Sequence, residues 1–264
     1  MINQNKFPVC FFGHGSPMNA ISQNAYTKAI QKYGESFNSK PECILSISAH
    51  WETHGFYYTD EQSPKQIYDM YGFPEDLYQL KYEVSGYPNI FKNIHSLDFI
   101  KPSSQLGSQK WGIDHGTWSV LTHFRPQADT PVVQLSLNCD GSLYDHYIFG
   151  KKLAAIDRAK VLIIGSGNIV HNLRRFSWEE NAAILDWSAS FDQWIHQNVS
   201  QKKYENIIMN WESHPASSLA VPSLEHFLPF IICLGIASES NLTPQVIFDG
   251  IQNASLAMRS YAFK

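Results

Sequence analysis

The sequence carries little charge, and neither sign is concentrated anywhere along it. Charged residues make up 17% of the 264 residues, the formal net charge is -4, and no block of lysine and arginine stands out. Proteins that bind nucleic acid or an anionic membrane surface need such a basic patch. We therefore expect no nucleic acid and no membrane among its partners.

Long apolar runs are missing as well. No stretch approaches the roughly 20 consecutive apolar residues that a membrane-spanning helix needs. The polar start, Met1–Lys6, lacks the pattern of a secretory signal peptide. These two features predict a cytoplasmic protein.

Cysteine is scarce, and its spacing excludes the common cysteine-based sites. The four cysteines are far apart and form no Cys-x-x-Cys pair, which argues against a zinc ribbon or a dithiol redox centre. Each lies in or beside an apolar run, where free cysteine behaves as a small hydrophobic residue. The sequence therefore predicts buried, reduced thiols at Cys10, Cys43, Cys139 and Cys233.

Several familiar catalytic motifs are also absent. Ile164 stands two residues before Ser166, so the Gly-x-Ser-x-Gly elbow of serine hydrolases is not formed. The run Gly165–Val170 lacks the third glycine of a dinucleotide-binding fingerprint, and neither a phosphate-binding loop nor His-Glu-x-x-His occurs. These absences exclude the usual designs of serine hydrolases, dinucleotide-binding enzymes, P-loop enzymes and zinc proteases.

Apolar residues, at 44%, supply enough material for a large core. A helical spacing occurs at Asn181–Val199. Four apolar runs lack the clean polar–apolar alternation of half-exposed strands, and this lack is typical of strands covered on both faces. The runs are Val9–Phe12, Cys43–Ser48, Val132–Leu137 and Val161–Ile164. The pattern predicts an α/β fold in which residues 1–264 form a single domain, with a largely parallel or mixed central sheet covered by helices on both faces.

Two further segments have a distinct character. Glu61–Gly112 is rich in tyrosine, proline, glycine and polar residues, which predicts a long irregular connection that covers a site rather than builds the sheet. The chain after Thr243 is expected to supply closing strands at a sheet edge.

Three of the four predicted strands end beside a histidine. The first leads into Gly13-His14-Gly15, the second into Ala49-His50-Trp51, and the last into Gly165-Ser166-Gly167-Asn168 with His171 shortly after. In open α/β sheets, ligands bind beyond the carboxyl ends of the strands, so these histidines should meet in one cleft. Imidazole clusters suit zinc or ferrous iron. The sequence thus predicts a mononuclear metal site at the C-terminal ends of the strands and leaves the metal open.

The other histidines lie in less informative surroundings. His115 stands in a loop-like context, and Glu225-His226 lies near a predicted helix start with Ser223 as its N-cap, unless Pro229 marks the start instead. Six histidines are predicted to be ordinary surface or core residues: His54, His95, His123, His146, His196 and His214.

Six distinctive motifs are spread along nearly the whole chain. They are GHGSPMN (13–19), SAHW (48–51), WGIDHGTWSVL (111–121), PVVQLSL (131–137), IGSGNIVHNLR (164–174) and PSLEHFLP (222–229). In this combination they resemble the class III extradiol ring-cleaving dioxygenases, the LigB-like family, and within it the 4,5-DOPA dioxygenase extradiol-like branch. Any one of these motifs alone would be unspecific.

The resemblance implies a metal at the strand ends and matches His14 and His50 to two of its ligands. Some relatives use a glutamate as the third ligand, whereas the DOPA-type branch carries a Glu-His pair, represented here by Glu225 and His226. Either side chain could coordinate. We expect His226 to be the ligand and Glu225 to support it.

Catalytic roles follow from the same resemblance. His171 matches the acid/base residue and is also a candidate additional ligand when no substrate is present, while His115 matches a histidine on the substrate side. The implied activity is Fe(II)-dependent cleavage of a DOPA-like catechol with O2, giving a muconic semialdehyde. In that mechanism, His171 accepts a phenolic proton and later returns one.

Two alternatives remain open from the sequence. The histidines could hold Zn(II), which cannot change its redox state, in a hydrolase. The chain could also be a non-enzymatic metal-binding or signalling protein like the Memo proteins, which resemble this superfamily in fold. The sequence does not specify the physiological catechol or the oligomeric state.

Overall fold

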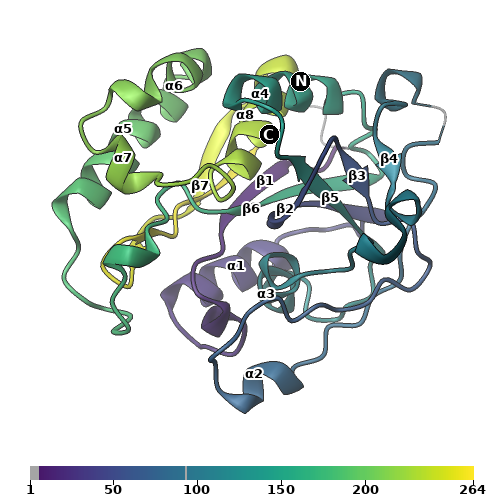
Figure 1. Cartoon of the computed structure of the whole chain (residues 1–264), viewed down its shortest axis with the longest axis horizontal. Helices are drawn as coiled ribbons and strands as arrows, with labels where there is room; N and C mark the ends of the chain where they lie inside the picture. Colours follow the sequence, from purple (N-terminus) through teal and green to yellow (C-terminus); the bar gives the residue numbers. More distant parts are fainter. Residues whose placement is uncertain (1–5, 93) are drawn as a thin grey trace.

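The computed structural model of the chain describes residues 6–92 and 94–264 (Figure 1). The absence of a signal peptide, predicted from Met1–Lys6, concerns residues that lie almost entirely outside this part. Across the described residues, no helix has both the length and the apolar character needed to cross a membrane.

Among the described residues, the centre of the fold is an eight-stranded mixed sheet with the order β4-β3-β5-β2-β6-β1-β10-β7. The central strands β5, β2, β6 and β1 run parallel, and β10 and β7 close one edge in antiparallel pairing. The strands are β1 (Val9–Gly13), β2 (Cys43–Thr53), β3 (Tyr57–Tyr58), β4 (Lys101–Pro102), β5 (Val132–Asn138), β6 (Val161–Gly167), β7 (Pro244–Phe248) and β10 (Ser260–Phe263). The predicted α/β fold with a mixed sheet is confirmed, and so are the closing strands after Thr243.

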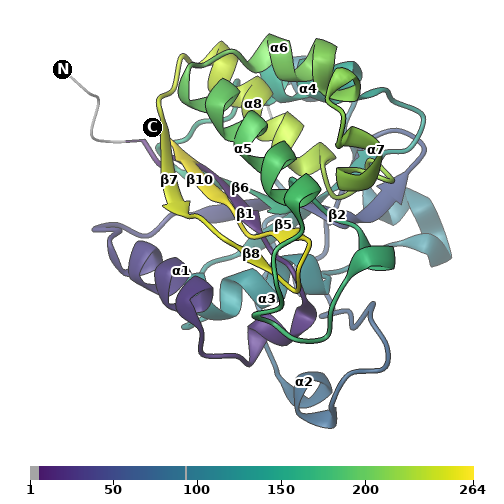
Figure 2. The same ribbon diagram turned by 90° about the vertical axis from the view of Figure 1, so that its left-hand side faces the viewer.

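Helices cover both faces of this sheet (Figure 2). One face carries α1 (Ala25–Glu35) and α3 (His115–Phe124), and the other carries α4 (Leu143–Leu153) and α8 (Leu228–Glu239). Outside α4 and α8 lie α5 (Asp186–Ser200), α6 (Tyr204–Asn210) and α7 (Ser217–Ala220).

Alternate residues of each central strand serve the two faces. In β1, Val9 and Phe11 join the core beneath α4 and α8, whereas Cys10 and Phe12 join the core beneath α1 and α3. Because both faces are buried, both sets of side chains are apolar. This is why β1 shows no polar alternation in the sequence.

The segment between β3 and α3 is irregular, as predicted for Glu61–Gly112, but contrary to the prediction it also contributes a strand to the edge of the sheet. It contains α2 (Glu75–Gln79), the short strand β4 and two 3-10 segments, His95–Leu97 and Ser103–Gln109. A separate small ribbon near the C-terminus pairs β8 (Ile251–Gln252) with β9 (Leu256–Ala257).

Strand β2 runs further than the predicted Cys43–Ser48. Its pairing with β5 shifts register between Ile47 and Glu52, and the strand then continues to Thr53. His50 therefore lies within the irregular stretch of β2 rather than after the strand. Such irregularities redirect side chains and are common beside functional sites.

Of the two helix starts considered in the sequence, the one at Asn181 is wrong, whereas the alternative start at Pro229 is confirmed to within one residue. The helix predicted from Asn181 begins at Asp186, because the preceding backbone bonds to the C-terminal segment instead: Leu185 N–H donates to the Ala254 carbonyl. Helix α8 begins at Leu228 with Pro229 in its first turn, where a missing N–H costs nothing.

The prediction of four buried thiols is wrong at one position. Cys10, Cys43 and Cys233 are buried, but Cys139 is exposed, because it follows the last residue of β5 and begins a tight turn at the rim of the sheet. All four cysteines are free thiols.

Candidate metal centre

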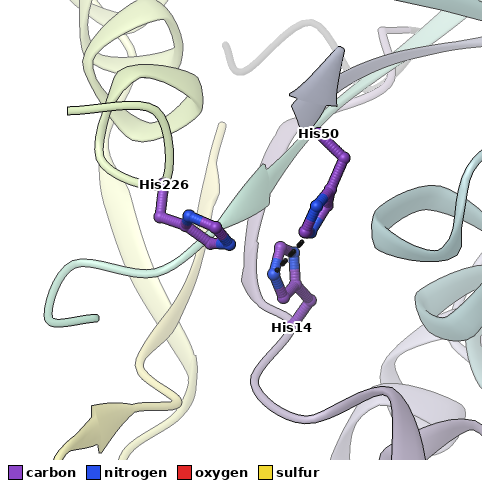
Figure 3. Close-up of side chains that lie close together, drawn as sticks. All are labelled: His14, His50 and His226. Carbon is purple, nitrogen blue, oxygen red and sulfur yellow. Dashed lines mark hydrogen bonds between the residues drawn. The ribbon is translucent and has the colours of Figure 1, made fainter. Parts of the chain in front are cut away.

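Three histidines from distant parts of the chain meet at the carboxyl edge of the parallel strands. His14 directly follows β1, His50 lies near the end of β2, and His226 lies in the loop that leads into α8. Figure 3 shows the three rings turned toward a common space. Their ligand atoms all lie within 4.8 Å of one another.

His14 is held from behind through its Nδ1 atom. Ser166, near the end of β6, places its Oγ 2.9 Å from His14 Nδ1. Because this hydroxyl donates its own hydrogen to the Gly116 carbonyl, it accepts a hydrogen from His14 Nδ1. The proton of His14 is thereby fixed on Nδ1, and Nε2 is left bare.

The other two rings have carboxylates behind Nδ1, one within hydrogen-bond distance and one slightly farther away. His226 Nδ1 lies 3.1 Å from Glu225 Oε1, which also accepts a hydrogen bond from Ser223. His50 Nδ1 lies 3.5 Å from Asp69 Oδ2. A carboxylate behind Nδ1 favours the tautomer whose Nε2 can bind a metal.

The Nε2 atoms of His14 and His50 face one another. His14 Nε2 and His50 Nε2 lie 3.4 Å apart, drawn as the dashed line in Figure 3. A pair of ring nitrogens facing each other across a buried space is repulsive when both are unprotonated. A cation between them would remove that repulsion, so the donor set fits a divalent metal bound by imidazole nitrogen.

The protonation of the three rings fits the same role. Burial, and then the neighbouring imidazoles, hold the pKa values of His14 and His226 well below the usual value. Burial, reinforced by His115, lowers the pKa of His50 to about 3. The rings are therefore neutral at neutral pH, which is the form that binds metal.

A glycine lets the loop that carries His226 reach the end of β6. A Cβ added to Gly167 would lie 2.2 Å from the His226 carbonyl oxygen. That same oxygen accepts a 2.8 Å hydrogen bond from the backbone N–H of Asn168. The strand end and the loop thus fix each other, and this contact needs a residue without a side chain.

His171 lies flat against His226. The ring centroids are 3.5 Å apart and the planes differ by 6°. Burial lowers the pKa of His171 to about 4, although the Glu225 carboxylate acts in the opposite direction. One ring nitrogen of His171 lies within 4.8 Å of ligand atoms of both Glu225 and His226.

His115 lies on the other side of the cluster, at the start of α3. Its ring centroid is 3.9 Å from that of His50. Its Nδ1 lies 2.9 Å from Asp69 Oδ2, and its backbone N–H donates to Asp69 Oδ1 at 2.9 Å. Burial acts to raise the pKa of Asp69, but the contacts with His115 and then His50 outweigh it and lower the pKa.

The structure therefore brings together all five histidines singled out in the sequence: His14, His50, His115, His171 and His226. Ser223 does not cap α8, since its hydroxyl bonds the Glu225 side chain instead. His115 lies at a helix start rather than in a loop, with Asp114 as the N-cap.

Sequence reasoning missed the groups that hold the histidines, above all Asp69 and Ser166. Asp69 lies in the irregular connection between β3 and α3, where no periodicity singles out a residue. Asp114 was visible as a cap-type residue beside His115. It is fully buried and accepts hydrogen bonds from Ser48, Trp111 and Gln134, and burial, with Asp69 adding, raises its pKa to about 6.

Comparison with known proteins identifies the family. The family model described as "Catalytic LigB subunit of aromatic ring-opening dioxygenase" matches residues 9–264. The chain belongs to this family. By this membership the chain is a ring-cleaving dioxygenase that takes a small-molecule substrate and O2. Members of the LigB family are metal-dependent enzymes.

Individual relatives of this LigB-family chain cover nearly its whole length. It is 34% identical to "4,5-DOPA dioxygenase extradiol" of Escherichia coli K12 over 98% of this chain and 96% of the relative. It is also 34% identical to the Beta vulgaris protein of the same name, over 96% and 95%. A crystal structure of an uncharacterized protein from Escherichia coli K12 superposes with a TM-score of 0.82 at 30% identity, covering 98% of this chain and all of that one.

Proposed function

We propose that residues 1–264 form one catalytic domain that opens the aromatic ring of a DOPA-like catechol beside its diol. Both atoms of O2 enter the product, which is a muconic semialdehyde. Two relatives named 4,5-DOPA dioxygenase extradiol support this substrate class. The convergence of ring nitrogens of His14, His50 and His226 at the strand ends is the observation that carries the proposal.

His14, His50 and His226 are the proposed metal ligands. Glu225 supports the third ligand rather than replacing it, because its Oε1 faces Nδ1 on the back of the His226 ring. The metal that we propose for activity is Fe(II), which would be held by these three histidines and would supply the redox chemistry with O2. Zn(II) suits the same three nitrogens and would give a bound but redox-inactive form.

His171 is the proposed acid/base residue. Its low pKa keeps it neutral before substrate binds, so it is ready to accept a proton from a phenolic oxygen. The negative charge of the deprotonated diol beside it then raises its pKa, because an opposite charge favours the protonated ring. His171 thereby holds the proton that must return when the ring opens. Its stacking on His226 also makes it a candidate ligand when no substrate is bound.

His115 is the proposed substrate-side histidine. Asp69 Oδ1 accepts the His115 backbone N–H, and Asp69 Oδ2 lies 2.9 Å from the ring Nδ1, so Asp69 positions His115 before substrate binds. A fixed ring can direct Nε2 toward a catechol oxygen without losing side-chain freedom in the process.

The test is O2 uptake with L-DOPA and simple catechols after anaerobic reconstitution with Fe(II). We expect uptake and a yellow semialdehyde product from the wild type. His14→Ala should lose both the iron and the activity, whereas His171→Phe should keep the iron and catechol binding but lose most of its turnover. No uptake from a folded, fully iron-loaded protein with any of these catechols would overturn the proposal.

A further inference from the structure

A second group of metal-ligating side chains lies at the rim of the same sheet edge. His54 follows β2, and Cys139 and Asp140 follow β5, the neighbouring parallel strand. Their ligand atoms lie within 4.8 Å of one another, and all three residues are exposed. None of them contributes to the metal centre described above. His54 was predicted to be an ordinary surface or core histidine.

The two turns that carry these residues are tied together by backbone bonds. The Cys139 N–H donates to the Thr53 carbonyl at 2.9 Å. Asn138 Oδ1 accepts from the N–H of Gly55 at 2.8 Å and from that of Asp140 at 3.2 Å. Hydrogen bonds therefore fix the backbone that carries the three side chains, although the side chains themselves are exposed to solvent.

The contacts within the group converge on one atom, His54 Nδ1. Cys139 Sγ lies 3.4 Å from this nitrogen, and the two carboxylate oxygens of Asp140 lie 2.9 and 3.1 Å from it. A catalytic Cys-His-Asp relay would use both ring nitrogens, one for the nucleophile and one for the carboxylate. Here the thiol and the carboxylate face the same ring nitrogen, and a sulfur, a nitrogen and an oxygen atom within 4.8 Å of one another fit the ligands of one cation.

The spacing is close to that of a tetrahedral zinc site. With metal bonds of about 2.0 Å to nitrogen or oxygen and about 2.3 Å to sulfur, neighbouring ligand atoms stand roughly 3.3 to 3.5 Å apart. The nitrogen–sulfur distance already lies in this range, and the nitrogen–oxygen distance needs to open by about 0.4 Å. Exposed side chains can make such an adjustment by small rotations.

We propose that His54, Cys139 and Asp140 form a second divalent-metal site, with water as the fourth ligand. The thiolate makes it selective for a borderline-soft ion such as Zn(II), unlike the imidazole centre. Binding releases the thiol proton of Cys139 to solvent, so affinity rises with pH. The LigB-family chain would then hold two metals of different preference.

Cobalt(II) distinguishes the two sites by spectroscopy. A thiolate ligand gives Co(II) an intense near-ultraviolet charge-transfer band, whereas imidazole, carboxylate and water ligands give only weak visible bands. The other three cysteines are buried, so Cys139 is the thiol open to added metal. Titration of the whole protein should produce the band, saturating at one thiolate-bound cobalt per chain, and Zn(II) should displace it.

Variants separate this site from the imidazole centre and from a lone reactive thiol. Cys139→Ser should abolish the band, and His54→Ala and Asp140→Asn should each weaken the affinity at least tenfold. His14→Ala should leave the band unchanged. His95→Ala is the matched control, because His95 pairs with Asp98 at 3.3 Å on an equally exposed surface that has no thiol.

A second measurement does not depend on cobalt. Alkylation of Cys139 by iodoacetamide should slow at least tenfold in the presence of Zn(II), and this protection should be lost in His54→Ala. No charge-transfer band in the wild type at several-fold excess of cobalt would overturn the proposal. So would a band, or zinc protection, that is as strong in His54→Ala and Asp140→Asn as in the wild type.

Discussion

Replacing Ser166 with alanine tests how the centre controls the protonation of its ligands. The hydroxyl accepts from His14 Nδ1 and donates to the Gly116 carbonyl, so it fixes the His14 proton on the side away from the metal. In the variant without metal, His14 can move its proton to Nε2 and donate to His50 Nε2, 3.4 Å away. Metal binding then has to reverse this choice.

The size of the effect follows from that reversal. In the metal-bound variant, the buried His14 Nδ1–H has no acceptor from Ser166, and an unsatisfied buried donor costs about 1–3 kcal/mol. At about 1.4 kcal/mol per factor of ten, metal affinity should fall roughly 5- to 140-fold. Losses of partners behind metal-bound histidines in other proteins are about 10- to 100-fold.

The assay is competition with a chelator for Fe(II) or Zn(II), with unfolding measured in parallel. Ser46→Ala is the matched control, because Ser46 is equally buried on β2 but its hydroxyl bonds Thr117 Oγ1 at 2.8 Å. Both variants should lose about 1 kcal/mol of unfolding free energy. Only Ser166→Ala should bind metal more weakly. Equal metal affinity in the two variants would refute the reasoning.

Three further predictions follow from the site. The metal-free protein should lose stability as the pH falls from about 6.5 toward 4, by up to roughly 1.4 kcal/mol per pH unit for each buried histidine. The reason is that the unfolded chain binds protons in this range, whereas buried His50 and His171, with pKa values of about 3 and 4, stay unprotonated in the folded chain. A melting temperature that does not change over this range would contradict the prediction. Gly167→Ala should reduce metal affinity at least roughly tenfold, because the added Cβ would lie 2.2 Å from the His226 carbonyl oxygen and push the loop away. The same chelator competition measures this affinity, and an unchanged value would show that the loop moves without cost. Asp69→Ala should lower kcat/KM for a catechol roughly tenfold or more while the fold is retained, because it removes the carboxylate beside both His115 and His50. Steady-state O2 uptake measures the activity and circular dichroism checks the fold. Wild-type kinetics in the variant would show that Asp69 does not position these rings.

The sequence was most informative where burial restricts it. The strands around Val9–Phe12 and Val161–Ile164 could be recognised because both faces are covered, which leaves a continuous apolar run ending in glycine and histidine. Parallel strands share one carboxyl edge, so the meeting of His14 and His50 followed from the strand pattern alone. The pairing of Glu225 with His226 needed the family resemblance.

Tertiary contacts decided what the sequence pattern missed. Asp69 reaches the histidines from an irregular segment, where position depends on the whole fold rather than on local spacing. The start of α5 depends on a backbone bond to Ala254, nearly seventy residues away in sequence. Cys139 follows an apolar strand, which suggested burial, but the turn that begins at Cys139 leaves its side chain exposed to solvent.

The most direct test of the metal centre is anomalous diffraction from crystals soaked with Fe(II) under anaerobic conditions, measured at the iron absorption edge. The account predicts an iron peak about 2.1 Å from Nε2 of each of His14, His50 and His226, the usual metal–imidazole distance. Iron bound instead through the carboxylate of Glu225, or between Asp69 and His115, would contradict it.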